Sequence, residues 1–161
     1  MNQLDMTSLL TITHLEKEDT ATINTIADWY HSEWGTPIVK TWERLQTQSA
    51  ENTIVQIIAR MDDVLVGTGG LRAEVNIFQI HPHLRIHVPW IALLYVQPDF
   101  RNRQIGSHLL SHLEAEARQR GHSSVYLYTF TAESLYERAG YTSVERLDYK
   151  GHDTVVMMKN V

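Results

Sequence analysis

The segment from Trp90 to Gly121 places the strongest constraint on how this chain folds. An apolar run that ends at Val96 leads into a turn containing Arg101 and Arg103, and an amphipathic stripe at helical spacing follows until Gly121. An apolar strand followed directly by such a helix buries both apolar surfaces when the helix packs on the sheet that contains the strand. The segment therefore predicts a helix lying on a sheet.

The turn in front of this predicted helix is suited to an anion. The first N–H groups of a helix have no intrahelical partner, and the helix dipole adds partial positive charge there. Arg101 and Arg103 stand at that end, and Gly106 lets a ligand or a neighbouring strand approach the backbone closely. The pattern fits a phosphate or pyrophosphate site. It equally fits two solvated arginines and a glycine that eases helix–sheet packing.

Two familiar phosphate-binding motifs are excluded for this turn. No Gly-Lys-Ser/Thr triplet follows it, so it is not a P-loop, and it has one glycine where the dinucleotide fingerprint needs three. The run Gly67-Thr68-Gly69-Gly70 resembles a phosphate loop but lies within a predicted hairpin, where it indicates a bulge or a close strand approach.

The rest of the chain predicts a mixed order of strands and helices around one sheet. Residues 74–87 give no clear pattern, and Asp62-Asp63 and Lys150-Gly151 are the expected hairpin turns. Strands are predicted over 10–15, 53–61, 64–72, 88–96, 124–130, 144–149 and 154–159, and helices over 16–34, 40–50, 104–120 and 132–139. This order predicts the α/β class and gives no sign of a linker or a repeat.

Composition narrows the classes of protein and of partner. A chain of 161 residues fits one domain over 1–161. The absence of cysteine excludes disulfide scaffolds, thiolate metal sites and a cysteine nucleophile, and it fits a cytoplasmic location. With 14 Lys+Arg against 19 Asp+Glu, we expect no nucleic-acid partner. The first twenty residues show no secretory signal, and no apolar run is long enough to span a membrane, so we expect no membrane partner.

The segment VQPDFRNRQIGSHLL resembles the acetyl-CoA-binding motif of the GNAT superfamily of N-acetyltransferases, Arg/Gln-x-x-Gly-x-Gly/Ala. Arg101, Ile105 and Gly106 match this motif, whereas Gln104 stands where the family usually has its first glycine. A second block, 125–144, resembles the family's Leu-Tyr-x-x-x-Gly-Phe/Tyr ending and matches it at Leu135, Tyr136, Gly140 and Tyr141. The two motifs occur in the family's order, and the order of elements agrees over nearly the whole chain.

This resemblance implies a specific fold and specific site residues. The fold is a single α/β domain with a mostly antiparallel, twisted sheet of about seven strands, about four flanking helices, and strands that splay at the acetyl-CoA site. The backbone from Leu94 to Val96 would meet the acetyl carbonyl, and that from Arg101 to Ser107 would hold the pyrophosphate. The implied coenzyme-binding residues are Leu94, Tyr95, Val96, Arg101, Asn102, Arg103, Gln104, Ile105, Gly106 and Ser107.

The resemblance also suggests residues for catalysis and for the acceptor. Tyr136 is the candidate general acid, because a phenol with an ordinary pKa of about 10 is protonated at neutral pH and can donate to a departing thiolate. Trp34 and Trp90 are candidate walls of the acceptor site. Trp90 and Ala92 occupy places where some relatives keep a base, and neither side chain can serve. His83, His87 and Glu33 remain candidates, so the sequence does not identify the base.

The expected activity is direct acetyl transfer from acetyl-CoA to a primary amine of a small molecule or a protein N-terminus. The alternatives are a non-catalytic acyl-CoA-binding or regulatory domain on the same fold, and a phosphate-binding module of unrelated chemistry. We expect no metal, because His108 and His112 share a helix face without further ligands around them. The resemblance leaves a homodimer open.

Overall fold

The computed structural model describes residues 9–47 and 53–161. Residues 1–8, on which part of the expectation about a secretory signal rests, lie outside this range, as do the last residues of the helix predicted over 40–50. Among the described residues, no helix combines the length and the hydrophobicity needed to cross a bilayer.

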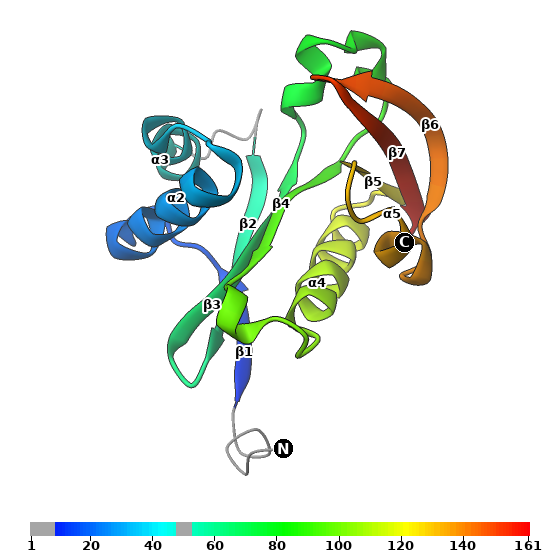
Figure 1. Cartoon of the computed structure of the whole chain (residues 1–161). Coiled ribbons are helices and arrows are strands. Elements are labelled where there is room, and N and C mark those ends of the chain that lie inside the picture. The colour runs from blue at the N-terminus through cyan, green and yellow to red at the C-terminus, as the bar shows by residue number, and fades with distance from the viewer. Residues whose placement is uncertain (1–8, 48–52) are drawn as a thin grey trace.

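The described residues form one twisted sheet of seven strands in the order β1-β2-β3-β4-β5-β7-β6 (Figure 1). All neighbours pair antiparallel except β4 and β5, which are parallel. This confirms the predicted mixed and mostly antiparallel sheet. The strands are β1 (Leu10–His14), β2 (Thr53–Met61), β3 (Val64–Arg72), β4 (Trp90–Val96), β5 (Ser124–Thr129), β6 (Thr142–Tyr149) and β7 (His152–Asn160).

Helices cover both faces of the sheet, with α2 and α3 on one side and α4 on the other (Figure 1). The region 74–87, which had no clear pattern, contains two short 3-10 helices, and a third precedes the basic turn. The bounds are α2 (Thr20–Trp34), α3 (Ile38–Thr47), η1 (Asn76–Gln79), η2 (Pro82–Ile86), η3 (Pro98–Phe100), α4 (Ile105–Gln119) and α5 (Glu133–Arg138).

Local signals set the two ends of α2. The Asp19 carboxylate accepts hydrogen bonds from the backbone N–H and the hydroxyl of Thr22, which makes Asp19 the N-cap. Gly35 ends the helix in a left-handed conformation with φ 69°, and its N–H donates to the carbonyl of His31. Between these ends Ile23, Ile26 and Tyr30 are completely buried. This stripe holds α2 on the sheet beside β4.

The core consists of three apolar clusters. The largest lies between the sheet and α4 and includes Ile105, Leu109 and Leu113. A second lies under α2 and α3, and a third gathers residues of η1 and η2 with residues of β4 and β7. Because both faces of β4 are covered in this way, its side chains enter different clusters according to the face they point to.

Candidate active site

The sheet opens between β4 and β5. The two strands share one residue pair, Trp90 with Tyr126, where the N–H of Tyr126 donates to the carbonyl of Pro89. From Ile91 to Val96, β4 pairs with β3 on its other side and has no paired residue on β5. An edge of this kind presents backbone N–H and C=O groups to a ligand. The predicted splay of the strands is therefore present in the fold.

A bulge in β4 lies within this opening. Thr68 pairs with Tyr95 and Gly70 pairs with Ala92, so Gly69 alone stands opposite both Leu93 and Leu94. Leu93 has φ 55°, an unusual left-handed conformation for a leucine. The bulge interrupts the pairing of β4 with the Gly67-Thr68-Gly69-Gly70 run of β3. This confirms the bulge that the sequence offered there as one of two possibilities. Sequence reasoning missed the role of Leu93, and the only signal for it was that glycine run on the neighbouring strand.

A buried tyrosine holds the bulge in place. The Tyr30 hydroxyl donates to the carbonyl of Leu93 at 2.8 Å and accepts from the side-chain amide of Gln56 at 3.2 Å. Tyr30 is completely buried, and this burial raises the pKa of its phenol. The phenol is thus a permanent donor to Leu93 at neutral pH, and α2 is tied to the most irregular residue of β4.

The predicted coenzyme residues of β4 divide between the two faces of the sheet. Leu94 and Val96 pack against the cluster under α4, whereas Tyr95 belongs to the cluster under α2. This division follows from the alternation of side chains along a strand. Only the backbone of Tyr95 can therefore face the same ligand as Leu94 and Val96.

The loop from Arg101 to Ser107 leads from the end of β4 into α4. Asn102 and Gln104 have φ 64° and φ 65°, whereas Arg103 between them is not left-handed. Alternation of this kind turns successive backbone N–H groups into a concave arrangement that binds anions. Gln104 is the N-cap of α4, and no side chain caps the first turn. The free N–H groups of that turn are thus available to a phosphate.

Gly106, in this first turn, has room for a Cβ. A Cβ at Gly106 would meet only Val96 Cγ2, at the ordinary contact distance of 3.8 Å. The proposal that this glycine eases helix–sheet packing is therefore wrong. The bare backbone is instead consistent with a ligand above the turn, so the residues present fit the pyrophosphate that the resemblance implies.

The Arg101 side chain does not extend over this concave turn. Its Nε donates to the carbonyl of Val96 at 2.8 Å, and its guanidinium lies over the Tyr95 ring at 5.5 Å from the ring centre. Tyr95 packs under α2, on the opposite face of the sheet from α4. The Arg101 guanidinium therefore lies toward the α2 side of the sheet, and its part in the anion site stays a prediction. The Arg103 guanidinium lies over the ring of Phe100 at 5.5 Å.

Tyr136 lies on α5 and packs against the same cluster as Leu94 and Val96. Its ring meets Tyr141 edge-on with 5.7 Å between ring centres. Burial raises the pKa of the Tyr136 phenol, so the hydroxyl stays protonated at neutral pH. The candidate acid is thus on the α4 side of the sheet, as are the side chains that flank the open edge of β4.

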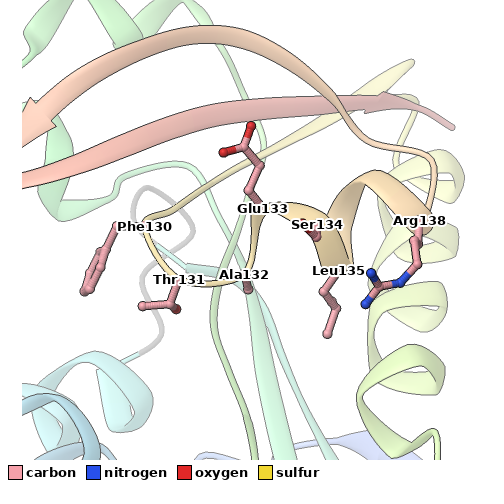
Figure 2. A pocket seen from close by; sticks show the side chains of 7 residues that line it. All are labelled: Phe130, Thr131, Ala132, Glu133, Ser134, Leu135 and Arg138. Carbon is pink, nitrogen blue, oxygen red and sulfur yellow. The ribbon is translucent and has the colours of Figure 1, made fainter.

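A cavity of about 360 Å³ lies where β5 turns into α5 (Figure 2). Leu135 and Arg138 point to one side of α5, and Glu133 points to the other side, where it binds Arg146. Phe130 and Leu135 are both half exposed and give the cavity apolar walls. The lining residues are Phe130, Thr131, Ala132, Glu133, Ser134, Leu135 and Arg138. Sequence reasoning assigned no ligand-binding role to this turn.

The two candidate acceptor tryptophans have different surroundings. Trp34 is 46% exposed at the end of α2 and meets the Tyr95 ring edge-on at 6.0 Å. Trp90 is completely buried, packs edge-on against Phe78 at 5.5 Å, and donates from Nε1 to the carbonyl of His87. A buried side chain cannot form the wall of a site, so the prediction for Trp90 is wrong. Trp34 remains a candidate.

The candidate bases are spread over the molecule. His83 bonds Glu145 at 2.8 Å on the outer part of the sheet, and the His87 ring stacks on Tyr126 at 4.4 Å. Glu33 lies 4.0 Å from Arg101. The structure brings Glu33 next to the loop from Arg101 to Ser107 and places His83 on η2, against Glu145 of β6. Across the described ranges, no three His, Asp or Glu side chains converge on a point that could hold a metal.

Comparisons with solved structures show where this fold occurs. The Enterococcus faecium aminoglycoside 6'-N-acetyltransferase superposes with a TM-score of 0.72 at 19% identity, over 93% of this chain and 96% of that one. An aminoglycoside 6'-N-acetyltransferase complexed with coenzyme A gives 0.74 at 19% identity over the same shares. The yncA protein of Salmonella typhimurium, solved with its cofactor acetyl-CoA, gives 0.69 at 20% identity over 94% and 93%.

Identities this low show the fold alone, so the family has to come from sequence. A comparison with curated protein sequences found no significant match. The family model described as acetyltransferase (GNAT) family matches residues 20–141. This match spans α2 to the end of α5 and contains both the loop in front of α4 and Tyr136. The chain therefore belongs to the GNAT family of acetyltransferases.

Proposed function

We propose that this protein is an N-acetyltransferase that moves the acetyl group of acetyl-CoA directly to a primary amine. The observation that carries this proposal is the opening between β4 and β5, which begins at the single pair Trp90–Tyr126, together with the uncapped first turn of α4, which follows β4 along the chain. An open strand edge suits an extended molecule with amide groups, and the turn beside it suits a diphosphate. Acetyl-CoA has both features.

The chain's own groups have distinct roles in this proposal. Backbone N–H groups from Leu94 to Val96 polarise the acetyl carbonyl, and those from Arg101 to Ser107 bind the pyrophosphate. When bound, acetyl-CoA supplies a thioester that an amine can attack. The C–N bond forms as the C–S bond breaks, and the Tyr136 hydroxyl gives its proton to the departing sulfur. The amine nitrogen loses one proton to water as the amide forms, and water returns a proton to the Tyr136 oxygen. With no cysteine in the chain, an acetyl-cysteine enzyme is excluded.

The acceptor is proposed as a small-molecule amine, with a peptide or protein N-terminus as the second class. Aminoglycoside acetyltransferases share the fold at low identity, which supports an amine acceptor without selecting one. A cytoplasmic location and a homodimer stay predictions from sequence. The test is CoA release from acetyl-CoA in the presence of an aminoglycoside, a polyamine, a free amino acid and a peptide with a free α-amino group.

Tyr136→Phe tests the catalytic assignment. We expect kcat to fall by about 10²-fold, the usual contribution of a positioned general acid, with unchanged affinity for CoA. Because burial raises the pKa of Tyr136, the wild-type rate should show no loss from deprotonation of this group below about pH 10. Tyr141→Phe is the matched control, since its ring lies 5.7 Å from Tyr136 but its hydroxyl binds Glu114.

Three outcomes would contradict parts of the proposal. Tight CoA binding without turnover on any amine would favour the acyl-CoA-binding or regulatory domain. An unchanged kcat in Tyr136→Phe would remove Tyr136 as the acid while leaving the transferase assignment in place. If CoA fails to bind and does not compete with inorganic pyrophosphate, the chain is a phosphate-binding module of different chemistry.

A further inference from the structure

The contacts of Arg101 join two parts of the molecule that have separate roles. Arg101 starts the coenzyme loop, yet its side chain makes all three of its described contacts with β4 and α2. Nε donates to the Val96 carbonyl at 2.8 Å, the guanidinium lies 5.5 Å over the Tyr95 ring, and a terminal nitrogen is 4.0 Å from Glu33. The side chain thus spans from the loop to the last turn of α2.

Tyr95 is the residue through which these contacts reach α2. Its ring stacks on Trp29 at 5.1 Å and meets Trp34 edge-on at 6.0 Å, and both tryptophans lie on α2. Only 7% of Tyr95 is exposed, so its ring has little room to move independently of them. Any displacement of the Arg101 side chain therefore changes the surroundings of Trp34, the exposed candidate wall of the acceptor site.

We propose that Arg101 is a positioning residue that fastens the coenzyme loop to the end of α2 through Val96, Tyr95 and Glu33, and thereby couples coenzyme binding to the acceptor wall at Trp34. This inference rests on the proposed function, which assigns the loop to the coenzyme, and on Trp34 as the candidate wall of the acceptor site. It replaces the expectation that the guanidinium itself binds phosphate.

The relative strength of the three contacts determines the design of the test. The Arg101 and Glu33 side chains are 44% and 42% exposed and 4.0 Å apart, so this ion pair contributes little by itself. The bond to Val96 and the contact with the Tyr95 ring require the planar guanidinium. A lysine ammonium cannot donate to Val96, lie flat on an aromatic ring and face Glu33 at once. A phosphate, in contrast, binds a lysine ammonium well, because the ammonium acts on it as a point charge.

The first experiment compares the tryptophan emission of wild type, Arg101→Gln and Arg101→Lys without coenzyme, with Trp34→Phe to identify the signal of Trp34. We expect both Arg101 variants to shift the emission assigned to Trp34 and Arg118→Gln, at the far end of α4, to leave it unchanged. If neither Arg101 variant shifts it, the proposed contact is overturned whether or not CoA binds.

The second experiment titrates CoA by calorimetry at several salt concentrations while the emission is followed. We expect CoA to change the Trp34 signal of wild type and this response to be lost in both Arg101 variants. The salt dependence of the CoA Kd should stay that of wild type, and the Kd itself should rise by no more than about fivefold. Glu33→Gln should keep most of the response, because the exposed ion pair is the weakest of the three contacts.

Three results distinguish failure of this inference from failure of the proposed function. Arg101→Gln could weaken CoA binding by more than about tenfold and reduce its salt dependence, while Arg101→Lys keeps the affinity of wild type. In that case the guanidinium is a phosphate ligand and the inference is wrong. If CoA binds wild type without changing the Trp34 signal, the coupling is wrong. If wild type binds no CoA although the Arg101 variants shift the emission, the proposed function fails and the contact stands.

Discussion

Gly69 on β3 leaves the space that the Leu94 side chain fills at the bulge of β4. A Cβ at Gly69 would lie 2.9 Å from Leu94 Cδ1 and 3.1 Å from Leu113 Cδ1. We expect Gly69→Ala to cost about 1–2 kcal/mol of unfolding free energy, because Leu113 lies in the packed core and Leu94 packs against that core. It should also lower kcat by displacing Leu94 at the open edge. Urea unfolding and CoA-release rates test this, and wild-type stability would contradict it.

Gly106→Leu should separate folding from coenzyme binding. A Cβ at Gly106 meets only Val96 Cγ2, at an ordinary contact distance, and leucine is a better helix former than glycine, so we expect the unfolding free energy to be unchanged or up to about 1 kcal/mol higher. The same side chain would occupy the position proposed for the pyrophosphate and weaken CoA binding by more than about tenfold. Calorimetry measures the affinity. Gly106→Ala, which the family motif permits, is the control that should bind CoA normally.

Gln104→Gly should stabilise the protein. Gln104 has φ 65°, a left-handed conformation that costs an ordinary side chain about 1 kcal/mol and costs glycine nothing. We expect a gain of that size in urea unfolding and a CoA Kd equal to or lower than that of wild type. Asn102→Gly is the control at φ 64°, and its gain should be smaller because asparagine tolerates this conformation. Equal gains would contradict the strain at Gln104.

Tyr141→Phe should reduce stability without reducing the catalytic rate. The Tyr141 hydroxyl donates to the nearly buried Glu114 carboxylate at 2.8 Å, and Lys159 donates to the other oxygen at 3.1 Å. Removing one donor to a buried charge costs about 1.5–3 kcal/mol. The unfolding midpoint should fall while kcat, measured well below that midpoint, stays that of wild type. A fall in kcat equal to that of Tyr136→Phe would contradict the separate roles of the two tyrosines.

Because Asp19 is the N-cap of α2, the unfolding free energy should depend on pH in the acid range. The hydrogen bond from the Thr22 hydroxyl lowers the pKa of Asp19 from its ordinary 3.8, and the charge of Arg60 adds to this effect. A lowered pKa means that the stabilisation is complete above pH 3.8 and is lost as pH falls through the lowered value. Wild type should therefore lose more unfolding free energy than Asp19→Asn between pH 4 and pH 2. Parallel pH profiles would contradict the assignment.

Much of the fold could be predicted from the sequence because its signals are local. The apolar stripe between Ile105 and Ala117 fixes α4, Gly35 ends α2, and the turn at Asp62 and Asp63 sets the β2–β3 hairpin. Two motifs at the family's separation then support the fold class that this order predicts. These signals depend on residues close to one another in the chain.

The details of the site depend on contacts between distant residues, which periodicity does not reveal. Leucine has no preference for a left-handed φ, so the bulge at Leu93 depends on the glycines of β3 and on Tyr30. Trp90 was assigned wrongly because β4 is covered on both faces, and its sequence does not show which side is exposed. The direction of Arg101 depends on Tyr95 and Glu33, which approach it only in the folded chain.

The single pair between Trp90 and Tyr126 also bears on how the protein survives in solution. Because β4 and β5 share only one residue pair, backbone groups of β4 beyond that pair have no partner on β5. A molecule that lies along β4 can supply hydrogen-bond partners for these groups. Such a ligand raises the unfolding free energy, because it binds the native state and not the unfolded chain. The ligand-free molecule is then the form most open to proteolysis and heat, and the coenzyme pool that feeds the reaction would also protect the protein.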